Sequence, residues 1–99
     1  MKWRIVIRPR AETDVREARD WCESQRAGLG AEFLAEIDAT IQVLSRDPQR
    51  HAVYYCGFRR VLARRFPYKL FYRVEEDQII IFRILHVRRD HPRLLRPGH

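Results

Sequence analysis

The sequence lacks most of the features that stabilise small secreted or membrane proteins. It has two cysteines, Cys22 and Cys56, which form no CxxC pair, and only four glycines. No apolar run approaches the ~20 residues that a membrane helix requires, and arginine interrupts the first residues too often for a signal peptide. We therefore expect a cytoplasmic protein without disulfides, in which both cysteines are small packing residues.

The sequence also lacks the spacings that mark common catalytic and cofactor sites. Neither a GxGxxG nor a Walker pattern surrounds the glycine segment at residues 26–30, and no Ser-His-Asp or Cys-His arrangement can be argued. His86, Asp90 and His91 can be drawn as a metal cluster, but their spacing matches no standard site. We expect neither a metal ion nor a cofactor.

Acidic residues are scarce in the second half of the chain. Residues 1–50 carry nine Lys and Arg against nine Asp and Glu, whereas residues 51–99 carry eleven against four, so the whole net charge of +7 lies in the second half. A one-sided basic surface indicates an acidic partner, either a nucleic acid or an anionic protein segment. Eighteen of the twenty basic residues are arginine. The plainer alternative is that these arginines are ordinary solvated surface residues, encoded by a GC-rich genome in which arginine codons replace lysine codons.

The first half of the chain contains the patterns of one strand and two helices. Alternation over Lys2–Arg8 predicts a strand that Pro9 ends. Arg10–Gln25 is predicted to be a helix with an apolar stripe, and Ala31–Ser45 a second helix that Asp47-Pro48 ends. The stripe of the first helix consists of Ala11, Val15, Ala18 and Cys22 or Trp21. The apolar face of the second helix consists of Phe33, Leu34, Ile37, Ile41 and Leu44.

The second half contains three strand patterns within residues 59–90. Alternation over Tyr68–Val74 predicts a half-buried strand, with Phe71 and Tyr72 in the core. Ile79–Phe82 shows no alternation, which indicates a central strand covered on both faces. Continued alternation places His86 on one face with Ile80, Phe82 and Ile84. Residues 49–57 fit either an extended segment or a loop.

The predicted order is β-α-α-β-β-β in one domain over residues 1–99. This order predicts an α+β fold of two layers, in which an αα hairpin packs on one face of a small, mainly antiparallel sheet. The basic tail, residues 88–99, has Leu94 and Leu95 as its only clear anchors. It fits either a short helical turn or a loosely ordered arm.

Several blocks in this order resemble the RelE/ParE superfamily of toxins from bacterial type II toxin-antitoxin systems. The blocks span residues 3–90 and lie at residues 9–15, 44–48, 65–74 and 84–90. The resemblance implies a hetero-oligomeric complex with a cognate antitoxin, ParD-like or other, whose acidic C-terminal segment covers the basic face of the toxin. The arginines that we expect to bind a partner are Arg59, Arg60, Arg64, Arg65, Arg73, Arg89 and Arg93.

The superfamily has two activities, and the sequence leaves both open. ParE-like members inhibit DNA gyrase, whereas RelE-like members are endoribonucleases that cut mRNA on the ribosome. Metal-free RNA cleavage needs a base, an acid and cations around one phosphate. The resemblance makes Lys69, Arg83, His86 and Arg88 the candidate catalytic residues, with Lys69 at the position of a phosphate-binding arginine. Both residues also have a structural interpretation. Lys69 fits a solvated residue of a half-buried strand, and His86 fits a structural histidine with a satisfied hydrogen bond.

No tyrosine follows Tyr72, although the nucleolytic branch commonly places a tyrosine or histidine after the last strand. This departure favours a ParE-like gyrase inhibitor over the RelE-like nuclease. A third interpretation, a non-toxic basic domain that binds nucleic acid, predicts an affinity that falls steeply with salt.

Overall fold

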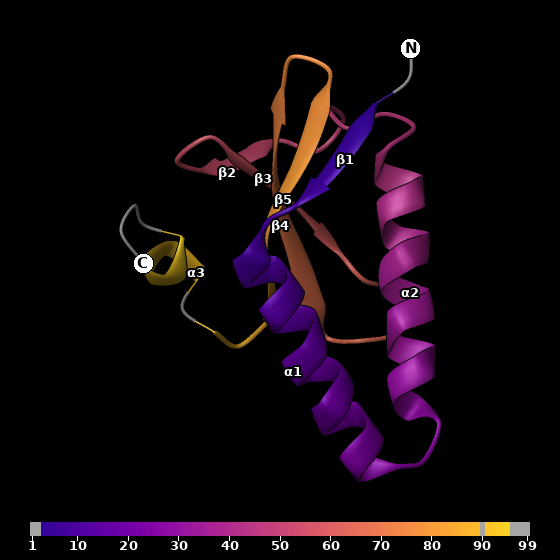
Figure 1. Cartoon of the computed structure of the whole chain (residues 1–99). Coiled ribbons are helices and arrows are strands. Elements are labelled where there is room, and N and C mark those ends of the chain that lie inside the picture. The colour runs from indigo at the N-terminus through magenta and orange to yellow at the C-terminus, as the bar shows by residue number, and fades with distance from the viewer. Residues whose placement is uncertain (1–2, 90, 96–99) are drawn as a thin grey trace.

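The computed structural model describes residues 3–89 and 91–95, and it shows two long helices packed against a five-stranded sheet (Figure 1). The elements in chain order are β1 (Arg4–Ile7), α1 (Pro9–Gln25), α2 (Leu29–Leu44), β2 (Val53–Tyr55), β3 (Phe58–Leu62), β4 (Tyr68–Glu75), β5 (Gln78–His86) and α3 (His91–Leu94). The predicted two-layer α+β fold is confirmed.

The sheet has the spatial order β1-β5-β4-β3-β2. β1 is parallel to β5, and the other three pairs are antiparallel. The chain starts at one edge, passes through the helical hairpin to the other edge, and returns strand by strand to β5. β5 thus lies between β1 and β4, and Ile79, Ile80 and Ile81 are buried, as the absence of alternation predicted.

The segment that the sequence left open contains the additional strand β2. Cys56 (φ 49°) and Gly57 (φ 80°) have positive φ angles and form the tight turn between β2 and β3. The order of elements before α3 is therefore β-α-α-β-β-β-β, with one strand more than the prediction.

The main core lies between the helices and the sheet. Phe33 of α2 meets Phe66 edge to face, with ring centroids 5.3 Å apart, and Cys22 of α1 is buried in the same core. Trp21, the other residue considered for the stripe of α1, is 60% exposed. Leu34 of α2 is exposed, so the predicted apolar face of α2 is wrong at that position. Burying a large apolar side chain contributes about 1.5–3 kcal/mol, which makes this core the main source of stability.

A second, smaller core lies on the other face of the sheet. It contains Phe58, Phe71, Leu85 and Leu95, with Leu94 packed against it. α3 lies on the side of the strands away from α2 (Figure 1). Of the two alternatives for the tail, the short helical turn is therefore present, and both predicted anchors contact the core.

A β-bulge interrupts the alternation of β5. Tyr72 of β4 pairs with Ile81, but Phe71 pairs with Arg83, so Phe82 is an extra residue on β5. After this residue the side chains change face, and Ile84 joins the core under the helices, whereas Phe82 packs on the opposite face. The prediction that Ile80, Phe82, Ile84 and His86 share one face is therefore wrong.

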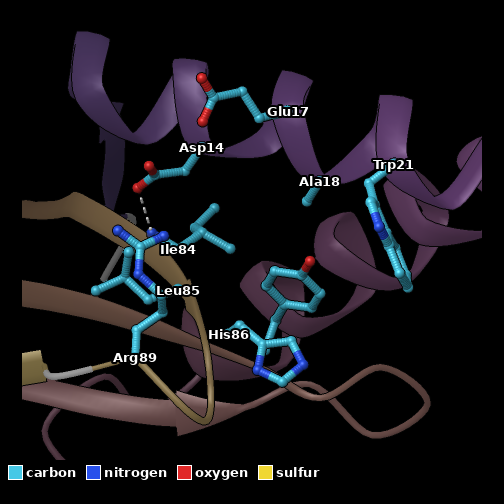
Figure 2. Close-up of a pocket in the computed structure, with 9 residues that line it drawn as sticks. Asp14, Glu17, Ala18, Trp21, Ile84, Leu85, His86 and Arg89 are labelled. Carbon is cyan, nitrogen blue, oxygen red and sulfur yellow. Dashed lines mark hydrogen bonds between the residues drawn. The ribbon is translucent and has the colours of Figure 1, made fainter.

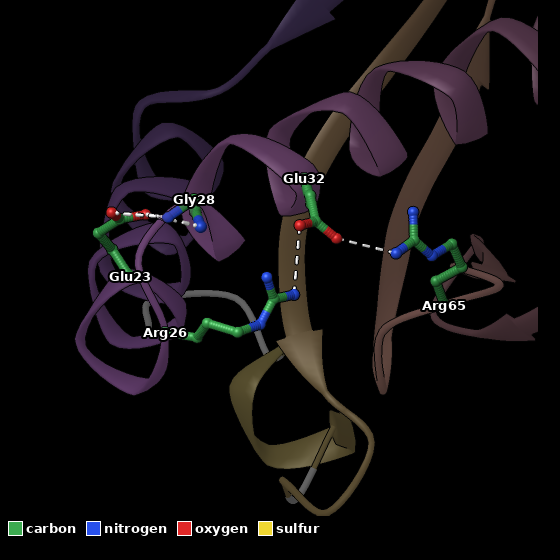
Figure 3. A network of polar contacts seen from close by, with 6 residues as sticks. Glu23, Arg26, Gly28, Glu32 and Arg65 are labelled. Atoms are coloured by element: carbon green, nitrogen blue, oxygen red, sulfur yellow. Dashed lines mark hydrogen bonds and ion pairs between the residues drawn. The ribbon is translucent and has the colours of Figure 1, made fainter.

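The tip of the helical hairpin is held by two acidic side chains (Figure 3). The Glu23 carboxylate accepts hydrogen bonds from the N–H groups of Gly28 and Gly30, at 3.0 Å each. Gly28 has φ 89°, so α2 begins at Leu29, earlier than predicted. The Glu32 carboxylate binds two arginines, Arg26 at 3.2 Å and Arg65 at 2.9 Å. Because Arg65 lies in the connection between β3 and β4, Glu32 links the tip of the hairpin to the sheet.

Candidate functional site

Two of the candidate catalytic residues lie on opposite faces of the sheet. Tyr68 pairs with His86, and Lys69 pairs with Leu85, in the antiparallel ladder of β4 and β5. Side chains that pair directly share a face. The His86 ring meets the Tyr68 ring edge to face at 5.3 Å, and Tyr68 packs under the helices. Leu85 belongs to the core on the other face. The sheet therefore separates Lys69 from His86.

Arg83, the third candidate, is buried in an ion pair. The residue as a whole is 6% exposed, and its Nε and a terminal nitrogen donate to the two oxygens of Asp14 at 2.8 and 3.0 Å. One Asp14 oxygen also accepts the N–H of Ile84 at 3.0 Å. The other terminal nitrogen of Arg83 approaches the carbonyl oxygen of Leu94 at 3.4 Å. The Arg83 charge is thus neutralised inside the fold.

His86 and Arg88 lie together at the end of β5. The Nδ1 of His86 accepts a hydrogen bond from the backbone N–H of Arg88 at 3.1 Å, which fixes the ring in addition to its contact with Tyr68. The Arg88 side chain is exposed. His86 therefore has both a packing partner and a hydrogen-bonding partner within the chain.

Several of the seven arginines assigned to partner binding also make contacts within the fold. Arg59 donates to the carbonyl oxygen of Gln49 at 3.1 Å. Arg65 binds Glu32, as described above. Arg60 and Arg73 stack on aromatic rings. Arg64, Arg89 and Arg93 are exposed at the surface.

The sheet face opposite α1 and α2 combines arginine with aromatic rings. The guanidinium of Arg60 lies 3.8 Å from the centre of the Tyr54 ring. That of Arg73 lies 4.4 Å from the Phe58 ring. Arg8 and Arg73 lie at 5.2 and 5.3 Å from the Phe82 ring. We call this surface the arginine–aromatic face, and we count Lys69 with it. Stacking holds the guanidinium groups in place, and a stacked guanidinium can bind carboxylate or phosphate through its edge. In Arg73, one terminal nitrogen already donates to the carbonyl oxygen of Cys56 at 2.7 Å.

A hollow of about 140 Å³ lies on the other side of the sheet, between α1 and the end of β5 (Figure 2). Its lining combines carboxylates, aromatic rings and one exposed arginine: Asp14, Glu17, Ala18, Trp21, Tyr68, Ile84, Leu85, His86 and Arg89. Burial raises the pKa of the Tyr68 hydroxyl. The charge of Asp14 is compensated by Arg83, but the exposed carboxylate of Glu17 repels a phosphate, so this hollow is poorly suited to the negative charge that develops in RNA cleavage.

The sequence did not reveal two buried polar interactions, the ion pair of Asp14 and the hydrogen bond of the Tyr72 hydroxyl, although it placed Tyr72 in the core correctly. An acid in the first turns of a helix is favoured by the helix dipole without any partner, but Asp14 occupies the buried stripe between Ala11 and Ala18. The Tyr72 hydroxyl donates to the carbonyl oxygen of Pro48 at 2.7 Å, and burial raises its pKa. The spacing of Asp14 from its alanine neighbours was the available signal, since a charge within an apolar stripe needs a buried partner.

Within the described ranges, no three His, Cys, Asp or Glu side chains come together as metal ligands. Asp90, one of the residues considered for such a cluster, lies outside the described residues. None of the described helices has the length and apolar character needed to cross a membrane.

The fold is similar to toxin-antitoxin proteins of known structure. A chain of the chromosomal ParDE system from P. aeruginosa matches with a TM-score of 0.76 and 18% identity, over 85% of this chain and 95% of that chain. A chain of the RelBE2 toxin-antitoxin complex from Mycobacterium tuberculosis matches with a TM-score of 0.61 and 21% identity, over 87% and 99%. Because both sequence identities are low, these similarities show that the fold is shared and show nothing further about this chain.

The sequence itself matches one protein family. The profile described as the ParE toxin of the type II toxin-antitoxin system parDE matches residues 5–91. No curated protein sequence matches the chain. Because the family profile covers most of the 99 residues, the chain belongs to the ParE toxin family.

Proposed function

We propose that this chain is a cytoplasmic toxin that inhibits DNA gyrase by binding to it. The observation that carries this proposal is the dispersal of the candidate catalytic groups. Lys69 and His86 lie on opposite faces of the sheet, and Arg83 is paired with Asp14 inside the fold. Metal-free RNA cleavage needs its base, acid and cations within hydrogen-bond reach of one phosphate. A toxin that acts by binding has no such requirement.

The same proposal includes an antitoxin that holds the toxin inactive. The ParDE and RelBE2 neighbours come from toxin-antitoxin systems, which supports a cognate antitoxin for this chain. The arginine–aromatic face offers Arg8, Arg60, Lys69 and Arg73 to an acidic segment of that antitoxin. Arginine binds carboxylates in a bidentate geometry, so such a segment fits this face better than it fits the hollow, which has the exposed carboxylate of Glu17 in its lining.

The second candidate function is cleavage of mRNA on the ribosome. The similarity to the RelBE2 complex favours it, and Lys69, Arg88 and Arg89 are side chains that the chain could present to RNA. In this alternative Arg83 must leave Asp14 to act as a catalytic cation. The buried ion pair makes that release costly.

Pulse-labelling after induction of this chain without its antitoxin tests the two functions against each other. We expect thymidine incorporation to fall before methionine incorporation, because gyrase inhibition stops DNA synthesis first. Lys69→Ala should then keep most of the toxicity. If methionine incorporation falls first, and Lys69→Arg keeps a toxicity that Lys69→Ala loses, the nuclease alternative is correct. If neither falls, the chain is not toxic, and the basic nucleic-acid-binding interpretation has to be tested by the salt dependence of its affinity.

A further inference from the structure

The hollow between α1 and the end of β5 contains two opposite charges that do not pair with each other. Glu17 of α1 and Arg89 of the segment after β5 both line it, and both are exposed. Among residues 3–89 and 91–95, neither side chain takes part in an ion pair or a side-chain hydrogen bond. The other carboxylate of the lining, Asp14, is neutralised by Arg83. The described lining therefore offers a carboxylate and a guanidinium to a ligand.

Aromatic rings form much of the remaining lining. Trp21 lies one helical turn after Glu17 on α1 and is 60% exposed, although tryptophan is highly buried on average. The rings of Tyr68 and His86 meet edge to face at 5.3 Å on the sheet side of the hollow. In Figure 2, α1 with Glu17 and Trp21 lies above the hollow, and His86 and Arg89 lie below it. A bound group therefore lies between rings as well as between charges.

The size of the hollow limits the ligand to a small molecule. Its volume of about 140 Å³ is close to that of a protein cavity of about 150 Å³ that binds benzene. The hollow therefore holds roughly six non-hydrogen atoms, as benzene has, and the open side leaves room for a few more. This volume is too small for a nucleotide and is sufficient for a single small amino acid.

The two charges select among small molecules. The Glu17 carboxylate repels a simple anion, and the Arg89 guanidinium repels a simple cation. A zwitterion satisfies both groups, because its ammonium binds the carboxylate and its own carboxylate binds the guanidinium in a bidentate geometry. An apolar side chain on the same molecule is removed from water by the rings of Trp21 and Tyr68. A free α-amino acid with an aliphatic side chain has all three groups.

We propose that this hollow binds a free aliphatic amino acid, such as leucine. The α-ammonium group lies at Glu17, the α-carboxylate at Arg89, and the side chain between Trp21 and the rings on the sheet. A residue of a peptide lacks at least one of the two charges, so the site distinguishes a free amino acid from a protein segment. This binding site goes beyond the proposed function and does not depend on it, because the arginine–aromatic face lies on the other side of the sheet.

An NMR titration with L-leucine tests the site, because each tryptophan gives its own indole N–H signal. The chain has two tryptophans, and Trp3 does not line the hollow. We expect leucine to shift the Trp21 signal with a Kd on the order of a millimolar, since exposed ion pairs are individually weak. The Trp3 signal should stay in place. A Trp21 signal that does not shift, or that shifts without saturating, overturns the proposal.

Two analogues of leucine separate the zwitterion from its single charges. Isoamylamine is leucine without the carboxylate, and isocaproate is leucine without the ammonium group. We expect each analogue to bind roughly tenfold more weakly than leucine, because each leaves one charge of the hollow unpaired and close to a like charge. If either analogue binds as tightly as leucine, the site does not recognise a zwitterion and the proposal is wrong.

Substitutions that remove one charge each show whether the groups pair as proposed. In Glu17→Gln the ammonium loses its partner, so isocaproate should bind about as well as leucine. In Arg89→Gln, isoamylamine should equal leucine for the same reason. Glu12→Gln and Arg16→Gln, at exposed positions of α1 outside the lining, are the matched controls and should keep the wild-type preference. Dispersed amide signals show that each variant is folded. A full preference for leucine in Glu17→Gln or Arg89→Gln, or its loss in the controls, contradicts the proposal.

Discussion

Asp14 of α1 and Arg83 of β5 form a buried ion pair that joins three parts of the fold. Their side chains are each 8% exposed, and 2.8 Å separates Oδ2 of Asp14 from Nε of Arg83. Asp14 also caps the backbone of β5 at Ile84, and Arg83 reaches the carbonyl oxygen of Leu94 in α3. The first helix, the central strand and the C-terminal turn are therefore held by two side chains that are 69 residues apart.

Replacing Asp14 with asparagine should strongly destabilise the chain. The variant keeps a side chain of similar size but leaves the Arg83 charge buried without a counter-charge. Breaking a buried ion pair in this way costs about 3–5 kcal/mol. The measurement is the free energy of unfolding from denaturant titration. Asp38→Asn, at an exposed position of α2, is the matched control and should change stability by less than about 0.5 kcal/mol. Similar values for the two variants would show that the ion pair is not structural.

Truncating Leu95 to alanine should detach α3 from the sheet. Leu95 is 5% exposed in the smaller core, and removal of a buried leucine side chain costs about 2–5 kcal/mol. The exposed aromatic rings should then bind a hydrophobic dye. Leu62→Ala is the control, because Leu62 is 55% exposed and its loss leaves no cavity. A Leu95→Ala variant with unchanged stability and dye binding would mean that α3 does not contribute to this core.

Acid should loosen the tip of the helical hairpin. Hydrogen bonds from Gly28 and Gly30 hold the pKa of the Glu23 carboxyl below its usual range. Stability from a lowered pKa is present above the unfolded pKa and is lost as the pH falls through the folded one, so protection of both glycine amides should decline below about pH 4. Glu23→Gln should reduce this protection at neutral pH, whereas Glu12→Gln should not. Protection that is independent of pH would rule out this role of Glu23.

Alkaline pH should destabilise the fold through Tyr72. Burial raises the pKa of Tyr72, so above about pH 10 the unfolded chain loses a proton that the folded chain keeps. The free energy of unfolding should therefore fall as the pH rises through this range. Tyr72→Phe should cost about 1 kcal/mol at pH 8, through loss of the hydrogen bond to Pro48, and should flatten the alkaline decline. Tyr68 keeps part of the slope in both proteins. Parallel pH profiles would contradict the prediction.

Much of the fold follows from local patterns in the sequence. The alternation over Tyr68–Val74 and the apolar run at Ile79–Phe82 placed two central strands correctly, because strand periodicity is a local property. β2 was left open because it is only three residues long. The β-bulge at Phe82 was missed because it depends on the register with β4, and the positions of Ile84 and His86 follow from it.

The candidate site was harder to predict, because it depends on contacts between distant residues. Arg83 was predicted to be a candidate catalytic cation from the family resemblance, and only the packing of α1 on β5 brings Asp14 to it. Strand pairing, which the sequence does not give, puts Lys69 and His86 on opposite faces. The excess of positive charge in the second half was visible in the sequence. The stacking of arginine side chains on the rings of Tyr54, Phe58 and Phe82 was not, because it depends on the folded structure.

A supercoiling assay with purified DNA gyrase tests the central claim most directly. The chain, released from its antitoxin, is added to gyrase and relaxed plasmid, and in parallel to a cell-free translation reaction with a defined mRNA. We expect loss of supercoiling, its recovery when antitoxin is added, and intact mRNA. Cleavage of the translated mRNA, with supercoiling unaffected, would contradict the account and assign the chain a ribosome-dependent nuclease activity.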